Sequence, residues 1–354
     1  MTLDNENCMR AERATVPPPL WGRSTREARR EGDSPRSTHF ALGTPTPTLP
    51  HKGGGSPPPA WHRLRAEQSG ATIPILRSGL LAQQFCRSVA RTKVEAVFKH
   101  SLYLRHDDAF ICIGEPAIGN GPLTLIGNIG VSRLALQPGD AAVVCERDIT
   151  IGHSVRFTLD RSEVWRAPPW PACAPPARLI EACAVLARRA ASEAPDGFAQ
   201  HVLGAPKREA RETPLARAAR TREAKFAGWL SGMREAGQVP VQGLIGLGPG
   251  LTPSGDDFLV GALATLDAIG AGDAHTALAT AVANAAPGAT SALSACFLRA
   301  AAAGHVGEPL HRAVAALLTG DADAAVAAVA HIGHSSGWDM LAGIATVLRV
   351  ASSE

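Results

Sequence analysis

A change in apolar pattern at a Pro-rich segment, residues 167–176, most constrains how this chain can fold. Before this segment, residues 94–165 carry short apolar runs separated by turn residues, a pattern typical of strands. After it the chain is Ala-rich, and several segments are apolar on nearly every side, as in helices that pack among other helices. We therefore expect an α+β protein: a strand-rich N-terminal domain (71–166), the Pro-rich linker (167–176) and a helical C-terminal domain (177–352).

The apolar runs and the turn residues between them place the individual elements. Turns are expected at residues 119–122, 127–128 and 137–140, where Gly and Asn supply positive φ and Pro fixes the first turn position. The expected strands are Val94–Phe98, Ala109–Ile113, Leu123–Ile126, Ala141–Cys145 and Val155–Leu159. The expected helices are Arg178–Ala191, Lys207–Lys225, Phe258–Ile269, Ala274–Ala286, Ser291–Ala303, Pro309–Leu318 and Trp338–Leu348.

Residues 1–70 differ from the rest of the chain because they mix Pro, Gly, Arg and Ser without any apolar period. Such a segment cannot bury a core, so we expect a disordered tail. The stretch also resembles a translated intergenic repeat. This resemblance predicts a true start further downstream, at a non-Met codon near residues 80–94.

Composition excludes several classes of function. The formal charge is +3, and residues 1–70 account for all of it, with ten Lys and Arg against seven Asp and Glu. The remainder lacks the basic excess of a nucleic-acid-binding protein. The seven cysteines are odd in number and form no C-x-x-C, and no apolar run is long enough to span a membrane. We expect a cytoplasmic protein that binds neither nucleic acid nor membrane and needs no metal or cofactor.

The Gly-rich segment at residues 243–257 carries the most chemical information. Thr252 is a good helix N-cap and Pro253 suits the first helical position, which predicts a helix start here. The N–H groups of the first turn would then lack helical partners, and the preceding glycines would let a ligand approach, so we expect an anion site. The motif is neither a P-loop nor a dinucleotide fingerprint. The predicted binding residues are Gly248, Gly250, Thr252, Ser254, Gly255 and Asp256.

The start of this helix recurs later in the chain. Residues 254–261, SGDDFLVG, share Ser, Gly, Asp, Leu and Gly in register with residues 336–343, SGWDMLAG. Two similar helix starts suggest one shared site, so Asp257 and Asp339 are the predicted catalytic carboxylates. The second helix start adds Ser335, Ser336 and Gly337 as binding residues.

A structural interpretation competes with this one. The glycines could serve a tight turn, and Asp256 and Asp257 could complement the helix macrodipole, worth about 0.3 to 1 kcal/mol each. Alternatively, Asp257 and Asp339 could each hold the free N–H groups of the opposite helix. Against a purely structural role, the helix after Asp257 is apolar on nearly every side, and buried carboxylates are costly unless they are paired.

At residues 248–257, GPGLTPSGDD, with support from residues 335–339, SSGWD, the chain resembles the AllH-like family. This family contains a subunit of the oxamate carbamoyltransferase of anaerobic allantoin degradation, a branch of purine catabolism. The resemblance covers roughly residues 90–350. It implies transfer of a carbamoyl group between carbamoyl phosphate and oxamate, with oxalurate as the other partner of the equilibrium, in a complex with two further subunits. The S-T-R-T-R signature of the better-known carbamoyltransferases is absent.

Three functions follow from these observations. The first is a subunit of a carbamoyltransferase, or of a closely related acyl-transfer enzyme, that binds a small anionic substrate. The second is a metal-dependent hydrolase that uses Asp256, Asp257 and Asp339 to hold Mg²⁺ or Mn²⁺. The third is a non-catalytic subunit that binds a carboxylate or phosphate for a partner.

Because residues 1–70 carry no apolar period, a chain shortened to begin near residue 71 is expected to remain folded and soluble. Circular dichroism and a solubility assay on both lengths test this expectation. An insoluble shortened chain beside a soluble full chain would contradict it.

Overall fold

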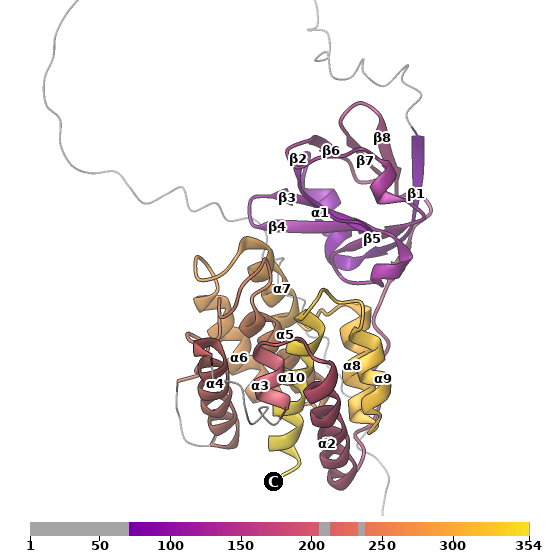
Figure 1. The fold of residues 1–354 in the computed structure, drawn as a ribbon. Helices are drawn as coiled ribbons and strands as arrows, with labels where there is room; N and C mark the ends of the chain where they lie inside the picture. Colours follow the sequence, from indigo (N-terminus) through magenta and orange to yellow (C-terminus); the bar gives the residue numbers. More distant parts are fainter. Residues whose placement is uncertain (1–70, 205–212, 233–237, 354) are drawn as a thin grey trace, which may run out of the picture. The chain divides into compact units, whose positions relative to one another are not determined.

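The computed structural model describes residues 71–204, 213–232 and 238–353. The expected disordered tail lies outside these residues, as do residues 207–212 of one expected helix. The described residues form a strand-rich domain followed by a helical domain, which confirms the expected α+β class (Figure 1). Strands give way to helices between Trp165 and Pro176, at the Pro-rich linker. The division of the chain into two domains at this linker stays a prediction.

The described strand-rich domain consists of short strands and three helical segments. These are β1 Ala71–Gly79, α1 Leu80–Ser88, β2 Arg91–Val97, β3 Ser101–His106, β4 Ala109–Gly114, η2 Pro116–Ile118, β5 Thr124–Gly127, η3 Val131–Arg133, β6 Ala141–Val144, β7 Asp148–Ile151, β8 Val155–Thr158 and β9 Glu163–Trp165.

The strands form one sheet that closes on itself. Their order is β5-β4-β3-β2-β6-β7-β8-β1-β9, and β1 also pairs antiparallel with β5. Burial alternates along β6 and β8, so one face of each strand points inward. The core between the strands contains Leu102, Ile111 and Phe157, and α1 adds Phe85 and Cys86 to it.

All five expected strands are present, as β2, β4, β5, β6 and β8. The expected turns are confirmed at Gly119 and Gly139, whose φ values are 76° and 97°. The strands β1, β3, β7 and β9 and the helix α1 were not predicted. A chain that began between residues 80 and 94 would lack β1, which closes the sheet.

The described helical domain contains nine helices. They are α2 Pro176–Glu193, α3 Phe198–Leu203, α4 Pro214–Ser231, α5 Ser254–Ala268, α6 Gly272–Ala285, α7 Ala292–Ala302, α8 Glu308–Leu318, α9 Ala322–Val329 and α10 Ser336–Ala351. Every expected helix has a counterpart, whereas α3 and α9 were not predicted.

Helix α5 lies in the middle of this domain and is buried along almost its whole length, from Ser254 to Leu266 (Figure 1). Its Phe258 ring meets Phe198 of α3 and Phe226 of α4 edge to face, at centroid distances of 5.5 and 5.3 Å. The sequence predicted that a helix apolar on nearly every side would pack among other helices. These contacts confirm that prediction for α5.

Helices α5 and α10 cross at two glycines. A Cβ added at Gly261 would lie 2.1 Å from the Met340 carbonyl oxygen, and one added at Gly343 would lie 2.0 Å from the Phe258 carbonyl oxygen. Only glycine therefore permits this backbone approach. Because Phe258 and Met340 are equivalent in the sequence repeat, the two helices contact each other in a pseudo-symmetric manner.

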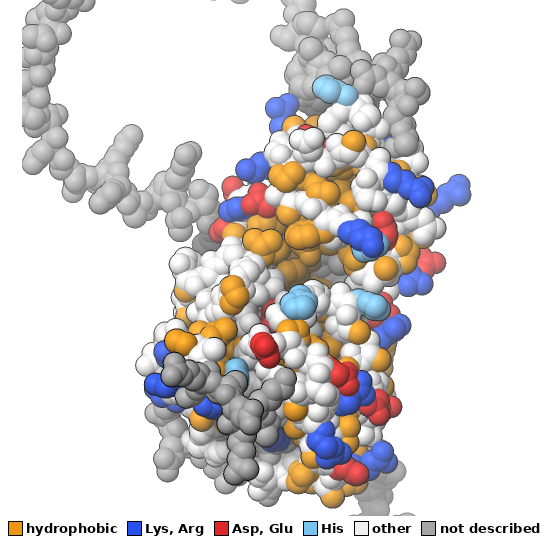
Figure 2. Space-filling view, in the orientation of Figure 1, with side chains coloured by type: hydrophobic (Ala, Val, Ile, Leu, Met, Phe, Trp, Pro, Cys, Tyr) orange, Lys and Arg blue, Asp and Glu red, His pale blue; other side chains and the backbone are white. Residues whose placement is uncertain are grey.

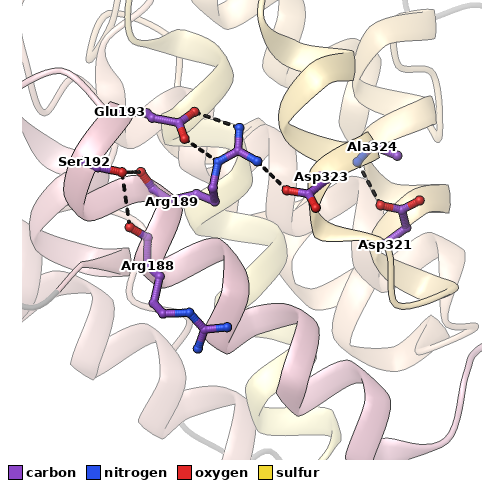
Figure 3. Close-up of polar contacts among 7 residues, drawn as sticks. All are labelled: Arg188, Arg189, Ser192, Glu193, Asp321, Asp323 and Ala324. Atoms are coloured by element: carbon purple, nitrogen blue, oxygen red, sulfur yellow. Dashed lines mark hydrogen bonds and ion pairs between the residues drawn. The ribbon is translucent and has the colours of Figure 1, made fainter.

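The Lys and Arg side chains on the drawn face are interspersed with acidic ones (Figure 2). They form no continuous basic area on that face. Arg189 of α2 pairs with Glu193 on the same helix and with Asp323 of α9 (Figure 3). Exposed ion pairs of this kind contribute about 0 to 1 kcal/mol, so they do not determine the packing of α2 against α9.

Two further expectations concern the cysteines and membrane spans. The six described cysteines are all free, and Cys86, Cys112, Cys183 and Cys296 are buried. None of the helices in the described ranges is long and apolar enough to span a bilayer.

The glycine crossing makes a specific prediction. Gly343→Ala should destabilise the protein by about 3 kcal/mol or more, because the new methyl group would overlap backbone of α5 that cannot move alone. Gly228→Ala is the matched control. Its Cβ would meet nothing within 4 Å, and alanine favours a helix, so we expect a stability gain of up to about 1 kcal/mol. Urea denaturation measures both changes, and equal effects would exclude the close crossing.

Candidate functional site

In the Gly-rich loop before α5, Gly246 and Gly248 each combine a positive φ with a close contact that a Cβ atom would disturb. Gly246 has a φ of 76°, and a Cβ there would lie 2.4 Å from the Ala289 carbonyl oxygen. Gly248 has a φ of 113°, and a Cβ there would lie 3.0 Å from the Ser254 nitrogen. Gly250 also has a positive φ, 104°, but faces open space. The loop therefore packs tightly against Ala289, before α7, at Gly246 and against Ser254, at the start of α5, at Gly248, and it is open at Gly250.

The start of α5 differs from the prediction. Pro253, and not Thr252, is the N-cap residue, and no side chain caps the helix. The Thr252 hydroxyl instead lies 3.0 Å from the Ser336 hydroxyl of α10. The Thr252 hydroxyl therefore contacts α10 and does not cap α5.

The expected row of free N–H groups at this helix start is also wrong in part. The Gly255 N–H donates to the Leu247 carbonyl oxygen at 2.9 Å, and the Asp256 N–H donates to the Pro253 carbonyl oxygen at 2.9 Å. At the second helix start, the Gly337 N–H donates to the Ile332 carbonyl oxygen at 3.1 Å. These three N–H groups are therefore not available to an anion.

Asp256 is fully buried, and both of its carboxylate oxygens are occupied. Oδ1 accepts from the Gly246 N–H at 2.8 Å, and Oδ2 accepts from the hydroxyls of Thr290 and Ser294, the latter at 2.6 Å. Ser291 caps α7 by accepting from the Ser294 N–H. Asp256 thus joins the Gly-rich loop to the start of α7, and both of its oxygens are engaged by other parts of the protein.

Asp257 is 3% exposed, and its Oδ2 has no hydrogen-bond donor. Burial raises the pKa of this carboxyl well above the usual aspartate range, and the charge of Asp339 adds to the rise. The hydroxyls of Ser336 and Thr252 oppose the rise as donors. These hydroxyls lie at the start of α10 and in the loop before α5, so Asp257 faces the opposite helix start.

Asp339 is 1% exposed and is equivalent to Asp257 in the repeat. Its Oδ1 accepts from the Ala199 N–H of α3 at 3.0 Å. Burial raises the pKa of Asp339 to about 6, while donors from Ser254, Ala199 and Ser335 oppose the rise. Although these hydroxyls influence the pKa, Oδ2 has no donor at hydrogen-bonding geometry.

The two aspartates therefore repeat the pseudo-symmetry of the helix crossing. Asp257 of α5 is influenced by Ser336, the first residue of α10, and Asp339 of α10 is influenced by Ser254, the first residue of α5. Each helix start thus places a carboxylate beside the serine of the other. Each of these buried carboxylates also keeps one oxygen without a partner, and such an atom is a candidate to meet a ligand.

A pocket of about 70 Å³ opens at Asp339. Its lining contains the predicted residues Ser254, Ser335 and Asp339, but not Asp257. The lining residues that sequence reasoning missed are Pro195, Asp196, Gly197, Phe198, Ala199, Leu215, Pro249 and Trp338. Pro-Asp-Gly at residues 195–197 is a turn signal, yet nothing in the sequence places it beside a helix start about 140 residues away.

A larger pocket, about 360 Å³, lies in the strand-rich domain and contains none of the predicted site residues. It is lined by Gln83, Arg87, Glu146, Arg147, Leu159, Asp160 and Ser162. Arg87 and Glu146 pair with each other at 3.4 Å and are 61% and 68% exposed. We favour the smaller pocket as the candidate site because one of its lining residues, Asp339, has a buried carboxylate oxygen without a partner, whereas the larger one is an exposed depression between solvated side chains.

The described residues contain no group of three or more His, Cys, Asp or Glu side chains arranged to hold a metal. The proposed triad of Asp256, Asp257 and Asp339 does not form one ligand set, because Asp256 is tied to the loop and to α7. The metal-dependent hydrolase therefore finds no support among these residues.

Comparison with known proteins gives one match. Residues 244–348 match the family model described as oxamate carbamoyltransferase subunit AllH, which confirms the resemblance over that segment. The segment contains the starts of both α5 and α10, and the strand-rich domain lies outside it. No curated protein and no solved structure matches this chain.

The raised pKa of Asp339 predicts a pH dependence of stability. A folded-state pKa of about 6 exceeds the unfolded value of roughly 4, so the contribution of this carboxyl is complete below pH 4 and is lost as the pH rises through about 6. Compared with Asp339→Asn, the natural protein should lose on the order of 2 to 3 kcal/mol of stability across this window. Urea midpoints measured from pH 4 to 8 test the difference. Asp323→Asn, at an exposed site on α9, should show no such window, and a pH-independent difference for Asp339→Asn would exclude the buried charge.

Proposed function

We propose that this chain is a subunit of a cytoplasmic carbamoyltransferase that acts on carbamoyl phosphate and oxamate, with oxalurate as the carbamoylated product, together with two other subunits. The observation that carries this proposal is the family match over residues 244–348, the segment that holds both aspartate-bearing helix starts. A closely related acyl-transfer reaction would use the same site.

The reaction needs an acceptor nitrogen that attacks the carbamoyl carbon. A C–N bond forms, the bond from that carbon to the phosphate oxygen breaks, phosphate leaves, and the attacking nitrogen loses a proton. We assign Asp339 as the group that orients the acceptor amide and takes this proton. Its pKa of about 6 supports this role, because a general base works best with a pKa near the working pH.

The remaining residues serve the two helix starts. We assign the hydroxyls of Thr252, Ser254, Ser335 and Ser336 to orienting the carboxylates and substrate oxygens, and Asp257 to the electrostatics of the pair. Gly248, Gly255, Asp256 and Gly337 act as positioning residues that hold the helix starts in place. Gly250, at the open end of the loop, remains the glycine at which a ligand could approach the backbone.

The size of the pocket supports the need for partner subunits. At about 70 Å³ it is far below the roughly 300 to 1,000 Å³ of ordinary small-molecule sites, so it holds part of a substrate and not two substrates together. The same observation favours the second candidate, a subunit that binds one substrate while a partner performs the chemistry. Catalysis by this chain alone would exclude that candidate.

A double-mutant cycle tests whether Asp257 and Asp339 act as one site. In the assembled complex, Asp339→Asn should lower kcat/KM for carbamoyl transfer by about 100-fold or more, because no general base would remain to take the proton from the attacking nitrogen. Asp257→Asn should also lower it. The combined loss should deviate from additivity by about 0.5 to 3 kcal/mol, since the two carboxylates influence each other.

Carbamoyl transfer is measured as oxalurate formed from carbamoyl phosphate and oxamate, with circular dichroism to confirm folding. Asp323→Asn serves as the control at a remote carboxylate. Effects that simply add would show that the two aspartates act separately, and full activity of Asp339→Asn would remove this residue from the mechanism.

A further inference from the structure

The pocket at Asp339 has an unusual balance of donors and acceptors. The two charged side chains among the described residues that line it are both carboxylates, Asp196 and Asp339. Asp196 is exposed, whereas Asp339 is buried and has one oxygen without a donor. The other polar side chains of the lining are the hydroxyls of Ser254 and Ser335, which can donate or accept.

Three backbone N–H groups at or beside the pocket already have partners. The Ala199 N–H donates to Oδ1 of Asp339, and the Gly255 and Asp256 N–H groups donate to carbonyl oxygens. The lining residues that the structure describes include no Lys or Arg, so a phosphate or carboxylate in this pocket would lie against the Asp339 carboxylate without a cation of that lining to compensate. Burying like charges together is strongly unfavourable.

The free oxygen of Asp339 instead requires a hydrogen-bond donor. An uncharged –NH₂ group of a carboxamide or ureido compound offers two N–H donors, for Asp339 and one neighbouring hydroxyl. An ammonium ion could also donate to these acceptors, but its charge costs more to desolvate than an uncharged group does. The apolar side chains of Phe198, Leu215 and Trp338 in the lining also suit an uncharged group better.

Resting on the carbamoyl transfer proposed above, we infer that this pocket takes the uncharged –NH₂ end of a carboxamide or ureido substrate, with Asp339 Oδ2 as its acceptor, and that it rejects phosphate and carboxylate groups. The phosphate of carbamoyl phosphate is then held outside this pocket. Asp339 therefore selects oxamate over its carboxylate analogue as well as serving the chemistry.

The test compares oxamate with oxalate, which carries a carboxylate in place of the –NH₂ group, on the full-length chain. Isothermal titration or ligand-observed NMR measures the two affinities. Oxamate should bind about tenfold tighter or more, because a site built to pair a donor penalises its loss by about that factor. Acetamide should likewise bind in preference to acetate and to methylammonium, and inorganic phosphate should not displace oxamate.

Variants then assign the preference to Asp339. Asp339→Asn should bring the oxamate-to-oxalate ratio close to one, since the amide offers a donor to either ligand, whereas Asp323→Asn should leave the ratio unchanged. If Asp339→Asn fails to fold, the comparison of ligands on the natural chain still decides. Equal affinity for oxamate and oxalate, tighter binding of methylammonium, or displacement of oxamate by phosphate would each overturn the inference.

The two proposals fail in different ways. If the assembled complex transfers no carbamoyl group while the chain still prefers oxamate over oxalate, the proposed function falls and the –NH₂ pocket stands. If the complex is active but the chain shows no such preference, the pocket assignment falls and the proposed function stands.

Discussion

The close crossing of α5 and α10 determines most of what this structure can do. Gly261 and Gly343 let the two backbones approach to a distance that any side chain would prevent. Each helix begins shortly before its glycine, at Ser254 or Ser336, so the crossing brings the two helix starts together. Each start then presents its aspartate beside the serine of the other. The candidate site is thus a consequence of helix packing, and the chemistry of Asp257 and Asp339 depends on two residues that have no functional group.

This arrangement has an energetic cost that the surrounding fold must offset. Two carboxylates, 3% and 1% exposed, each leave one oxygen without a donor, and an unsatisfied buried polar atom costs about 1 to 3 kcal/mol. Their position in the first turn of a helix returns only about 0.3 to 1 kcal/mol through the macrodipole. The aromatic side chains that meet at Phe258 pack on the same helix and contribute to stability there. Groups that are retained at such a cost are characteristic of sites that bind or transform a ligand.

The sequence predicted those features that depend on local pattern. The short apolar runs between turn residues predicted β2, β4, β5, β6 and β8, and the longer apolar segments predicted the central helices. Elements that depend on tertiary contact were missed. Pro74 argues against a strand, yet it lies in β1, where it pairs with Thr158 of a parallel neighbour. The N-cap assigned to Thr252 was wrong because its hydroxyl contacts Ser336. The pocket could not be predicted, since Ala199 reaches Asp339 across 140 residues of sequence.

The neighbouring residues Asp256 and Asp257 show why a motif alone does not identify a site. Successive positions on a helix point about 100° apart, so two adjacent carboxylates serve different partners. Asp256 satisfies both oxygens with the loop and α7, and the N–H groups of Gly255 and Asp256 are used within the loop and helix. The glycines and Asp256 therefore build the helix start and stabilise it. A ligand would instead meet polar atoms that have no partner in the protein. Among the residues that line the pocket, Asp339 has such an atom, and it lies outside the Gly-rich motif.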